Sequence, residues 1–139
     1  MSTGAADPPA IRRVWIVEDE PDAAALAAEL CLSSNSEPLV FRTALPFLVA
    51  LQSSSPPDAV VLDWRLEREL SAALFMATRH RYPNLPVVYW TGTTDALPGM
   101  VRDDRTTRVV DKADGAAAFE RAIEWALEAV ESAEDSARP

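Results

Sequence analysis

The stretch AVVLDWRL, residues 59–66, decides the fold of this chain. Its first four residues are apolar, which is typical of a strand buried on both faces of a sheet. The run ends on a carboxylate, Asp63. A carboxylate is rarely buried without a partner, because its charge is costly to remove from water. Asp63 therefore needs an opening to solvent, a cation or a chemical role.

Four more apolar runs of strand length accompany this one, and longer helical stretches separate them. The expected strands besides 59–62 are 12–17, 38–41, 86–90 and 107–110, and the expected helices are 22–34, 44–52, 68–81 and 115–133. Strands that alternate with helices form right-handed βαβ units, which build a parallel sheet with helices on both faces. The sequence therefore predicts an α/β fold, the flavodoxin-like doubly wound sheet of five parallel strands in the order 2-1-3-4-5.

The helix between the fourth and fifth strands is weakly signalled. Residues 92–104 have to bridge these strands, yet Pro98 and Gly99 stand together in the middle of the segment. In a helix interior proline costs about 3 kcal/mol and glycine about 1 kcal/mol relative to alanine. We therefore expect a short or broken helix here, capped by Thr93 and Thr94.

Composition indicates one domain. The 139 residues suit a single core, which we place at 11–131, with flexible tails at 1–10 and 132–139. A net charge of −9 argues against a nucleic acid partner. The apolar runs are too short for a membrane span and the start does not resemble a secretory leader, so we expect a cytoplasmic protein. Cys31, in an apolar helical pattern, is expected to be a core thiol.

Polar residues follow or end four of the five expected strands. Glu18 and Asp19 follow the first strand, Asp63 the third, Thr91 the fourth and Lys112 the fifth. The carboxyl ends of parallel strands share one edge, where open α/β sheets bind their ligands. Three carboxylates at one point repel one another, and Mg²⁺ relieves that repulsion. Acids, an ammonium and a hydroxyl at one place are what phosphoryl transfer requires, with Asp63 as the nucleophile.

Four motifs in this order resemble the receiver domain of two-component response regulators, over residues 11 to about 131. The motifs are VEDEP (17–21), VVLDWRL (60–66), VVYWTG (87–92) and VVDK (109–112). The family takes its phosphoryl group from a histidine kinase or from small donors such as acetyl phosphate. The resemblance therefore implies a sensor kinase or phosphotransfer protein as one partner and an unidentified downstream protein as another. It also implies self-catalysed phosphorylation and dephosphorylation in place of conventional enzyme turnover.

The resemblance assigns a role to each candidate site residue. Asp63 is the phosphoacceptor, Thr91 the switch hydroxyl and Lys112 the cation that pairs with the phosphate. The implied Mg²⁺ ligands are Glu18, Asp19, Asp63 and the backbone carbonyl of Arg65.

Several departures from the family fall near the face through which many receivers signal. Val109 stands where the family carries a Tyr or Phe that turns inward, and Ala113 replaces a proline that is often in a cis bond. We expect a trans bond before Ala113, because a cis bond to any other residue than proline costs about 2.5 to 4 kcal/mol. Glu67 and Ser71 replace the usual Pro and Gly of the loop after the third strand. We expect Tyr89 or Trp90 to report the phosphorylation state in place of that missing ring. Strand alternation should send these two rings to opposite faces of the sheet.

Two functions stay open, and a third ranks far below them. The first is a stand-alone response regulator, since no output domain follows residue 131. The second is a pseudo-receiver, a scaffold or interaction module whose partner binding ignores phosphorylation. A flavodoxin-like nucleotide binder shares the fold, but four glycines and no glycine-rich phosphate loop argue against it. A homodimer through an apolar seam of Trp125, Leu127 and Val130 on the last helix is also left open.

Overall fold

Five parallel strands form the sheet of this computed structural model, which describes residues 11–66 and 69–136. They are β1 (Arg12–Val17), β2 (Ser36–Phe41), β3 (Ala59–Leu62), β6 (Val87–Thr91) and β7 (Thr107–Asp111). Their order is β2-β1-β3-β6-β7, so the predicted order 2-1-3-4-5 is confirmed. The β-branched content of β3 and β6 suits strands that are covered on both faces.

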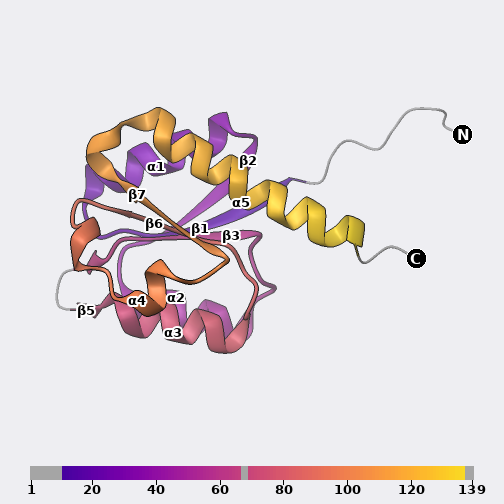
Figure 1. Cartoon of the computed structure of the whole chain (residues 1–139), viewed down its shortest axis with the longest axis horizontal. Helices are drawn as coiled ribbons and strands as arrows, with labels where there is room; N and C mark the ends of the chain where they lie inside the picture. Colours follow the sequence, from indigo (N-terminus) through magenta and orange to yellow (C-terminus); the bar gives the residue numbers. More distant parts are fainter. Residues whose placement is uncertain (1–10, 67–68, 137–139) are drawn as a thin grey trace, which may run out of the picture.

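Helices cover both faces of the sheet (Figure 1). The helices α1 (Pro21–Ser33) and α5 (Ala116–Ser136) lie on one face, and α2 (Ala44–Ser53) and α3 (Ser71–Arg81) on the other. Side chains alternate along each strand, so neighbouring residues enter different cores. Tyr89 packs in the core under α2 and α3, whereas Trp90 packs in the core under α1 and α5. The expectation that these two rings face opposite ways is confirmed.

Cys31 belongs to the core between α1 and α5. It is fully buried. Burial raises the pKa of its thiol to about 11, against the smaller effect of a hydrogen bond with Ser36. The interpretation of Cys31 as a core thiol is therefore confirmed.

The chain turns back on itself directly after the third strand of the sheet. A short strand β4 (Arg65–Leu66) pairs antiparallel with β5 (Glu69–Leu70), and α3 begins only at Ser71. The expected helical start at residue 68 is therefore wrong, because backbone pairing with β4 takes up residues 69 and 70 before the helix. The departure at Glu67 lies outside the described residues.

The segment between β6 and β7 is broken, as its proline and glycine predict. It holds a single 3₁₀ turn, η1 (Thr94–Ala96), and a four-residue helix, α4 (Gly99–Arg102). Pro98 stands at the start of α4. The expected caps are correct only in part. Thr93 stands at the N-cap position of η1 but its side chain makes no capping bond, and Thr94 is the first residue of the turn instead of a cap.

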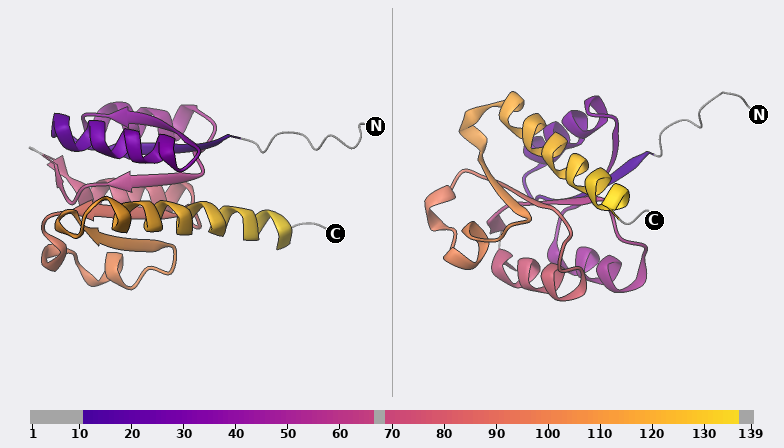
Figure 2. Two further views of the ribbon diagram at one scale, coloured as in Figure 1. Left: turned by 90° about the horizontal axis from the view of Figure 1, so that it is seen from above. Right: turned by 45° about the vertical axis from the view of Figure 1, so that its right-hand side comes forward.

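The last helix is longer than expected and projects beyond the other elements (Figure 2). It continues past residue 131 to Ser136, and the expected tail residues 1–10 and 137–139 lie outside the described part. Leu127 is a buried member of the core, so the proposed apolar seam loses its central residue. The guanidinium of Arg108 stacks over the ring of Trp125, 4.7 Å from its centroid. The side chain of Val130 is not among those described.

Within residues 11–66 and 69–136, no helix combines the length and the apolar character that a bilayer crossing demands.

Candidate functional site

Four strands bring the predicted site residues to the carboxyl edge of the sheet. Val17 of β1 and Leu62 of β3 are register partners, so Glu18 and Asp63 leave neighbouring strands at the same level. Thr91 of β6 is likewise the partner of Asp111 of β7, and Lys112 follows directly in the short turn η2 (Lys112–Asp114). The topology thus gathers groups that lie far apart in the sequence.

Lys112 joins the two buried carboxylates. Its Nζ lies 2.5 Å from Oε1 of Glu18 and 3.0 Å from Oδ2 of Asp63. Glu18 is 1% exposed and Asp63 is 6% exposed, so neither charge is satisfied by bulk water. The second oxygen of Asp63, Oδ1, accepts the backbone N–H of Arg65 at 3.1 Å. The ammonium of Lys112 is therefore the cation that pairs with the buried carboxylate of Asp63, directly after β3.

Burial and pairing set the ionisation of this cluster. Burial raises the pKa of Glu18 to about 7, the charge of Asp63 adds to this, and the hydrogen bond from Lys112 offsets it only in part. For Lys112, burial acts to lower the pKa, but hydrogen bonds to the two carboxylates outweigh it, so the pKa is raised. The ammonium of Lys112 is therefore a firm positive charge at the site.

Three carboxylates in this cluster have the spacing that a cation site needs. Glu18, Asp19 and Asp63 each offer an oxygen, and these oxygens lie within 4.8 Å of one another. Mg²⁺ prefers oxygen ligands and keeps several of its waters. Asp19 is only partly buried, so the three acids leave one side of the site open for those waters. The backbone of Arg65 lies beside Asp63 through its N–H, while the use of its carbonyl as a ligand stays a prediction.

The third acid of the VEDEP motif has a different task. The carboxylate of Glu20 accepts the backbone N–H groups of Asp22 at 3.2 Å and Ala23 at 2.6 Å, which caps α1 in front of Pro21. Such a cap satisfies N–H groups that have no partner within the helix. The motif therefore divides its acids between the site and the helix start.

The hydroxyl of Thr91 is held by Thr93. Thr91 is fully buried, its Oγ1 lies 3.1 Å from Oγ1 of Thr93, and it accepts the Thr93 backbone N–H at 3.3 Å. Thr93 therefore engages the predicted switch hydroxyl instead of the following turn. The one hint of this bond in the sequence is the spacing of Thr91 and Thr93, but a threonine just before a helix is equally typical of a helix N-cap.

Arg42 was not identified from the sequence. It follows β2, and its Nη2 donates to the backbone carbonyl of Asp19 at 2.7 Å. This bond ties the loop that carries Asp19 to a neighbouring loop. A single arginine after a strand gave no signal that could have found it.

The departures near the expected signalling face are visible in the structure. Val109 on β7 is 37% exposed and presents no aromatic ring to the site edge. None of the described residues is joined by a cis peptide bond, so the predicted trans bond before Ala113 is confirmed.

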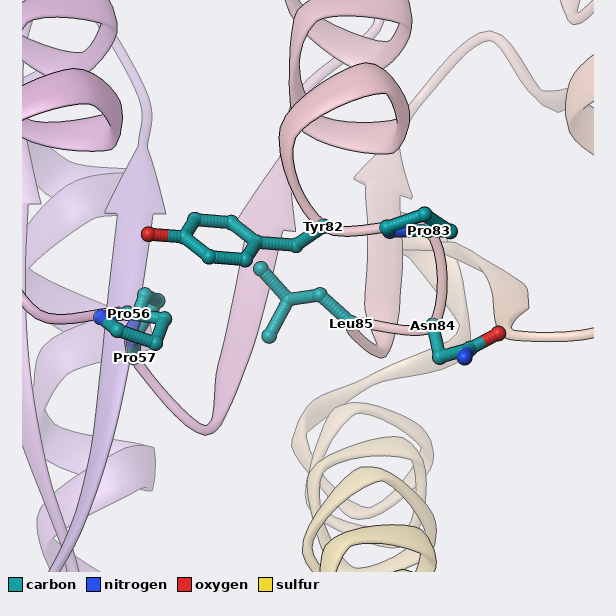
Figure 3. A pocket seen from close by; sticks show the side chains of 6 residues that line it. All are labelled: Pro56, Pro57, Tyr82, Pro83, Asn84 and Leu85. Atoms are coloured by element: carbon teal, nitrogen blue, oxygen red, sulfur yellow. The ribbon is translucent and has the colours of Figure 1, made fainter.

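An apolar pocket has a volume of about 320 Å³. Figure 3 shows the residues that line it, Pro56, Pro57, Tyr82, Pro83, Asn84 and Leu85. These residues precede β3 and β6, whereas the acids follow β1 and β3. The pocket therefore belongs to the opposite edge of the sheet and takes no part in the site.

Solved structures of receiver domains are similar to this chain over most of its length. A response regulator receiver domain protein from Bacillus halodurans has a TM-score of 0.72 and 18% identity, with 84% of this chain and 97% of that one covered. The N-terminal domain of a response regulator/sensory box/GGDEF 3-domain protein from Carboxydothermus hydrogenoformans has a TM-score of 0.75 and 22% identity, covering 87% and 98%. A response regulator receiver protein from Sinorhizobium medicae has a TM-score of 0.74 and 17% identity, covering 86% and 97%.

No protein-family model and no curated protein matches the sequence. The chain thus has the fold of response regulator receiver domains. This assignment rests on the similarity to solved structures. What the site does has to be argued from its own residues, because one fold serves many functions.

Proposed function

We propose that this chain is a response regulator receiver domain that accepts a phosphoryl group on Asp63 in a Mg²⁺-dependent reaction. The observation that carries the proposal is the position of the Lys112 ammonium, 3.0 Å from Asp63, beside a cluster of three carboxylates. The donor is a histidine kinase or a phosphotransfer protein, and the product acts on a downstream protein. Since such donors act inside the cell, we place the protein in the cytoplasm.

The reaction is a transfer between a nitrogen and an oxygen. A carboxylate oxygen of Asp63 attacks the phosphorus of a phosphohistidine, a P–O bond forms, and the P–N bond breaks with its electron pair left on the imidazole. The imidazole is then protonated from solvent. Water later attacks the acyl phosphate and restores the Asp63 carboxylate with release of inorganic phosphate.

The residues around Asp63 neutralise the charge of the transferred group. The ammonium of Lys112 pairs with one phosphoryl oxygen, and the Thr91 hydroxyl donates to another once it leaves Thr93. Glu18, Asp19 and Asp63 would hold Mg²⁺, which would further neutralise the charge of the phosphoryl group when bound. Positioning and neutralisation are the main demands of phosphoryl transfer, so few residues suffice.

The test is the intact mass of the protein after incubation with acetyl phosphate, with and without Mg²⁺. We expect one phosphoryl group on the wild type in the presence of Mg²⁺, and none on Asp63→Asn. The matched control is Asp22→Asn, which makes the same change on an exposed aspartate of the neighbouring helix start and should be phosphorylated normally. Equal incorporation in Asp63→Asn and the wild type would overturn the assignment of Asp63.

A pseudo-receiver is the second candidate, and the exposed Val109 and the four-residue α4 favour it. Both features weaken the route by which a phosphorylated site changes a distant surface. If neither acetyl phosphate nor beryllofluoride, a mimic of the phosphoryl group, reacts with the wild type, the pseudo-receiver becomes the better description.

A further inference from the structure

Trp90 is in direct contact with the charged end of Lys112. The Nζ of Lys112 lies 5.2 Å from the centroid of the Trp90 ring, within the range in which an aromatic face attracts a cation. The same ammonium is bonded to Glu18 and Asp63. Trp90 is 4% exposed, so this attraction acts where water screens little.

The indole is held by packing on its other side. Its ring meets that of Phe119, on α5, edge to face with centroids 4.9 Å apart. Among the residues that the structure describes, the buried Nε1 of Trp90 has no hydrogen-bond partner. A buried Trp N–H is usually bonded, but this one finds no partner in the described part of the chain. The ring is therefore held by packing against Phe119 and the rest of the core under α1 and α5, with Lys112 over its face.

We infer that Trp90 is a positioning residue that holds the Lys112 ammonium between Glu18 and Asp63 and passes any displacement of that ammonium to Phe119 on α5. The first half concerns the free protein and stands on the contacts above. The second half rests on the proposed function, because it requires a phosphoryl group on Asp63.

The displacement follows from charge. Phosphorylation gives the Asp63 position a charge of about −1.5 to −2, where the free carboxylate carries −1. The ammonium is drawn to the phosphoryl oxygens and the face of Trp90 loses its cation. Since Phe119 packs against that ring, the change reaches the first turns of α5 without an aromatic residue at position 109.

The sequence makes the first half directly measurable, because Lys112 is its one lysine. Protein labelled with ¹³C at the lysine ε-carbon gives a single ε-methylene signal that needs no assignment. In the wild type we expect its proton shift to be upfield of free lysine, through the ring current of Trp90. Trp90→Phe should keep much of this shift and Trp90→Leu should lose it.

The matched control is Trp125→Leu, which removes the tryptophan that carries Arg108 and should leave the Lys112 signal unchanged. The positioning role is overturned if the Lys112 shift is the same in the wild type and in Trp90→Leu. Should Trp90→Leu not fold, as judged by circular dichroism, a wild-type shift equal to that of free lysine overturns the role by itself.

A second readout is the rate of phosphorylation by acetyl phosphate. Because the cation–π contact is made before phosphorylation and is lost as the ammonium moves to the phosphoryl oxygens, its removal should make the reaction of Trp90→Leu faster by roughly twofold to thirtyfold, with return towards the wild-type rate in Trp90→Phe. A merely structural role would lower the stability of both variants without this recovery. Equal rates in Trp90→Leu and Trp125→Leu would count against positioning.

Beryllofluoride separates the relay from the proposed function. Its binding is followed by ¹⁹F NMR, and the response by the Lys112 signal and the ring protons of Phe119. We expect all three to change together in the wild type. Bound beryllofluoride with unmoved Lys112 and Phe119 signals overturns the relay and leaves the proposed function standing. Absence of bound beryllofluoride overturns the proposed function and the relay with it, while the shift in the free protein still decides the positioning role.

Discussion

At the scale of residues, the site is a balance of two buried acids against one cation. Side chains of Glu18 and Asp63 are 2% and 8% exposed, and the ammonium of Lys112 bonds both. Without a cation, two desolvated carboxylates would repel each other and lose the charged hydrogen-bond donor that they share. Lys112 therefore contributes to folding as well as to the proposed chemistry.

Replacing Lys112 by methionine should destabilise the protein. The methionine keeps most of the volume but leaves Glu18 and Asp63 without their shared cation, which costs about 3 kcal/mol for a buried pair. The measurement is the free energy of unfolding in urea at neutral pH. The double variant Glu18→Gln with Lys112→Met removes one of the two carboxylates and should recover part of the loss. If Lys112→Met were as stable as the wild type, the ion pairs would be unimportant for folding.

The sequence predicted which residues meet at this edge of the sheet better than it predicted the hydrogen bonds between them. Polar residues at four strand ends were enough to bring Glu18, Asp63 and Lys112 to one edge, because strand order fixes which ends are neighbours. The bond between Thr91 and Thr93 and the contact of Trp90 with Lys112 depend on rotamers and loop paths. Those are set by tertiary packing, which a linear pattern does not carry.

At the scale of elements, one arginine compensates for the short α4. Arg79 of α3 bonds Asp104 through Nε at 2.9 Å and through Nη2 at 3.1 Å. It also donates to the carbonyl groups of Leu85 at 2.5 Å and Thr106 at 3.1 Å. These bonds tie the end of α3 to the segments that precede β6 and β7. The short α4 is tolerated because Arg79, from another helix, holds the segment that follows α4 in place.

Asp104 should make stability depend on pH at the acid end. Partial burial acts to raise its pKa, but hydrogen bonds from Arg79 and Thr106 outweigh this and lower the pKa from 3.8 to about 2. A carboxyl whose pKa is lower in the folded state contributes stability that is fully present above the unfolded pKa and is lost as pH falls through the folded one. The contribution should therefore be complete above about pH 4 and vanish towards pH 2.

The measurement is the unfolding free energy of the wild type and of Asp104→Asn against pH. We expect the variant to be less stable by about 1 to 2 kcal/mol above pH 4, with the difference shrinking towards pH 2. Asp103→Asn alters the exposed neighbouring aspartate and controls for the loss of charge. A difference that stayed constant between pH 5 and pH 2 would contradict the role of the Asp104 carboxylate.

The elements themselves were predictable where patterns were long. The four principal helices and five sheet strands follow apolar periodicity, and Pro98 with Gly99 foretold the broken α4. The hairpin of β4 and β5 escaped prediction because its two-residue strands carry no periodicity, and residues 68–81 read equally well as one helix. Short backbone pairings are chosen by chain path more than by composition.

At the scale of the whole molecule, the sheet serves as a frame that collects charge at one edge. Core side chains on both faces fix β1, β3, β6 and β7 as neighbours, and the site then follows from where these strands end. The chain carries a net charge of −9, so acids gathered at one edge add to a general negative field. A divalent cation bound at the site would therefore stabilise the fold through both local and overall charge.

Magnesium should raise the melting temperature through the site itself. A ligand that binds the folded state at about a hundredfold excess over its dissociation constant contributes about 2.7 kcal/mol, which is several degrees for a domain of this size. Asp19→Asn removes one of the three carboxylates and should abolish most of the gain. Asp22→Asn changes the net charge equally but lies outside the cluster, and should respond like the wild type. Sodium chloride at equal ionic strength reports the screening of surface charge alone. If Asp19→Asn and Asp22→Asn responded alike, the gain would come from the net charge of the chain, and the three acids would not act as a metal site.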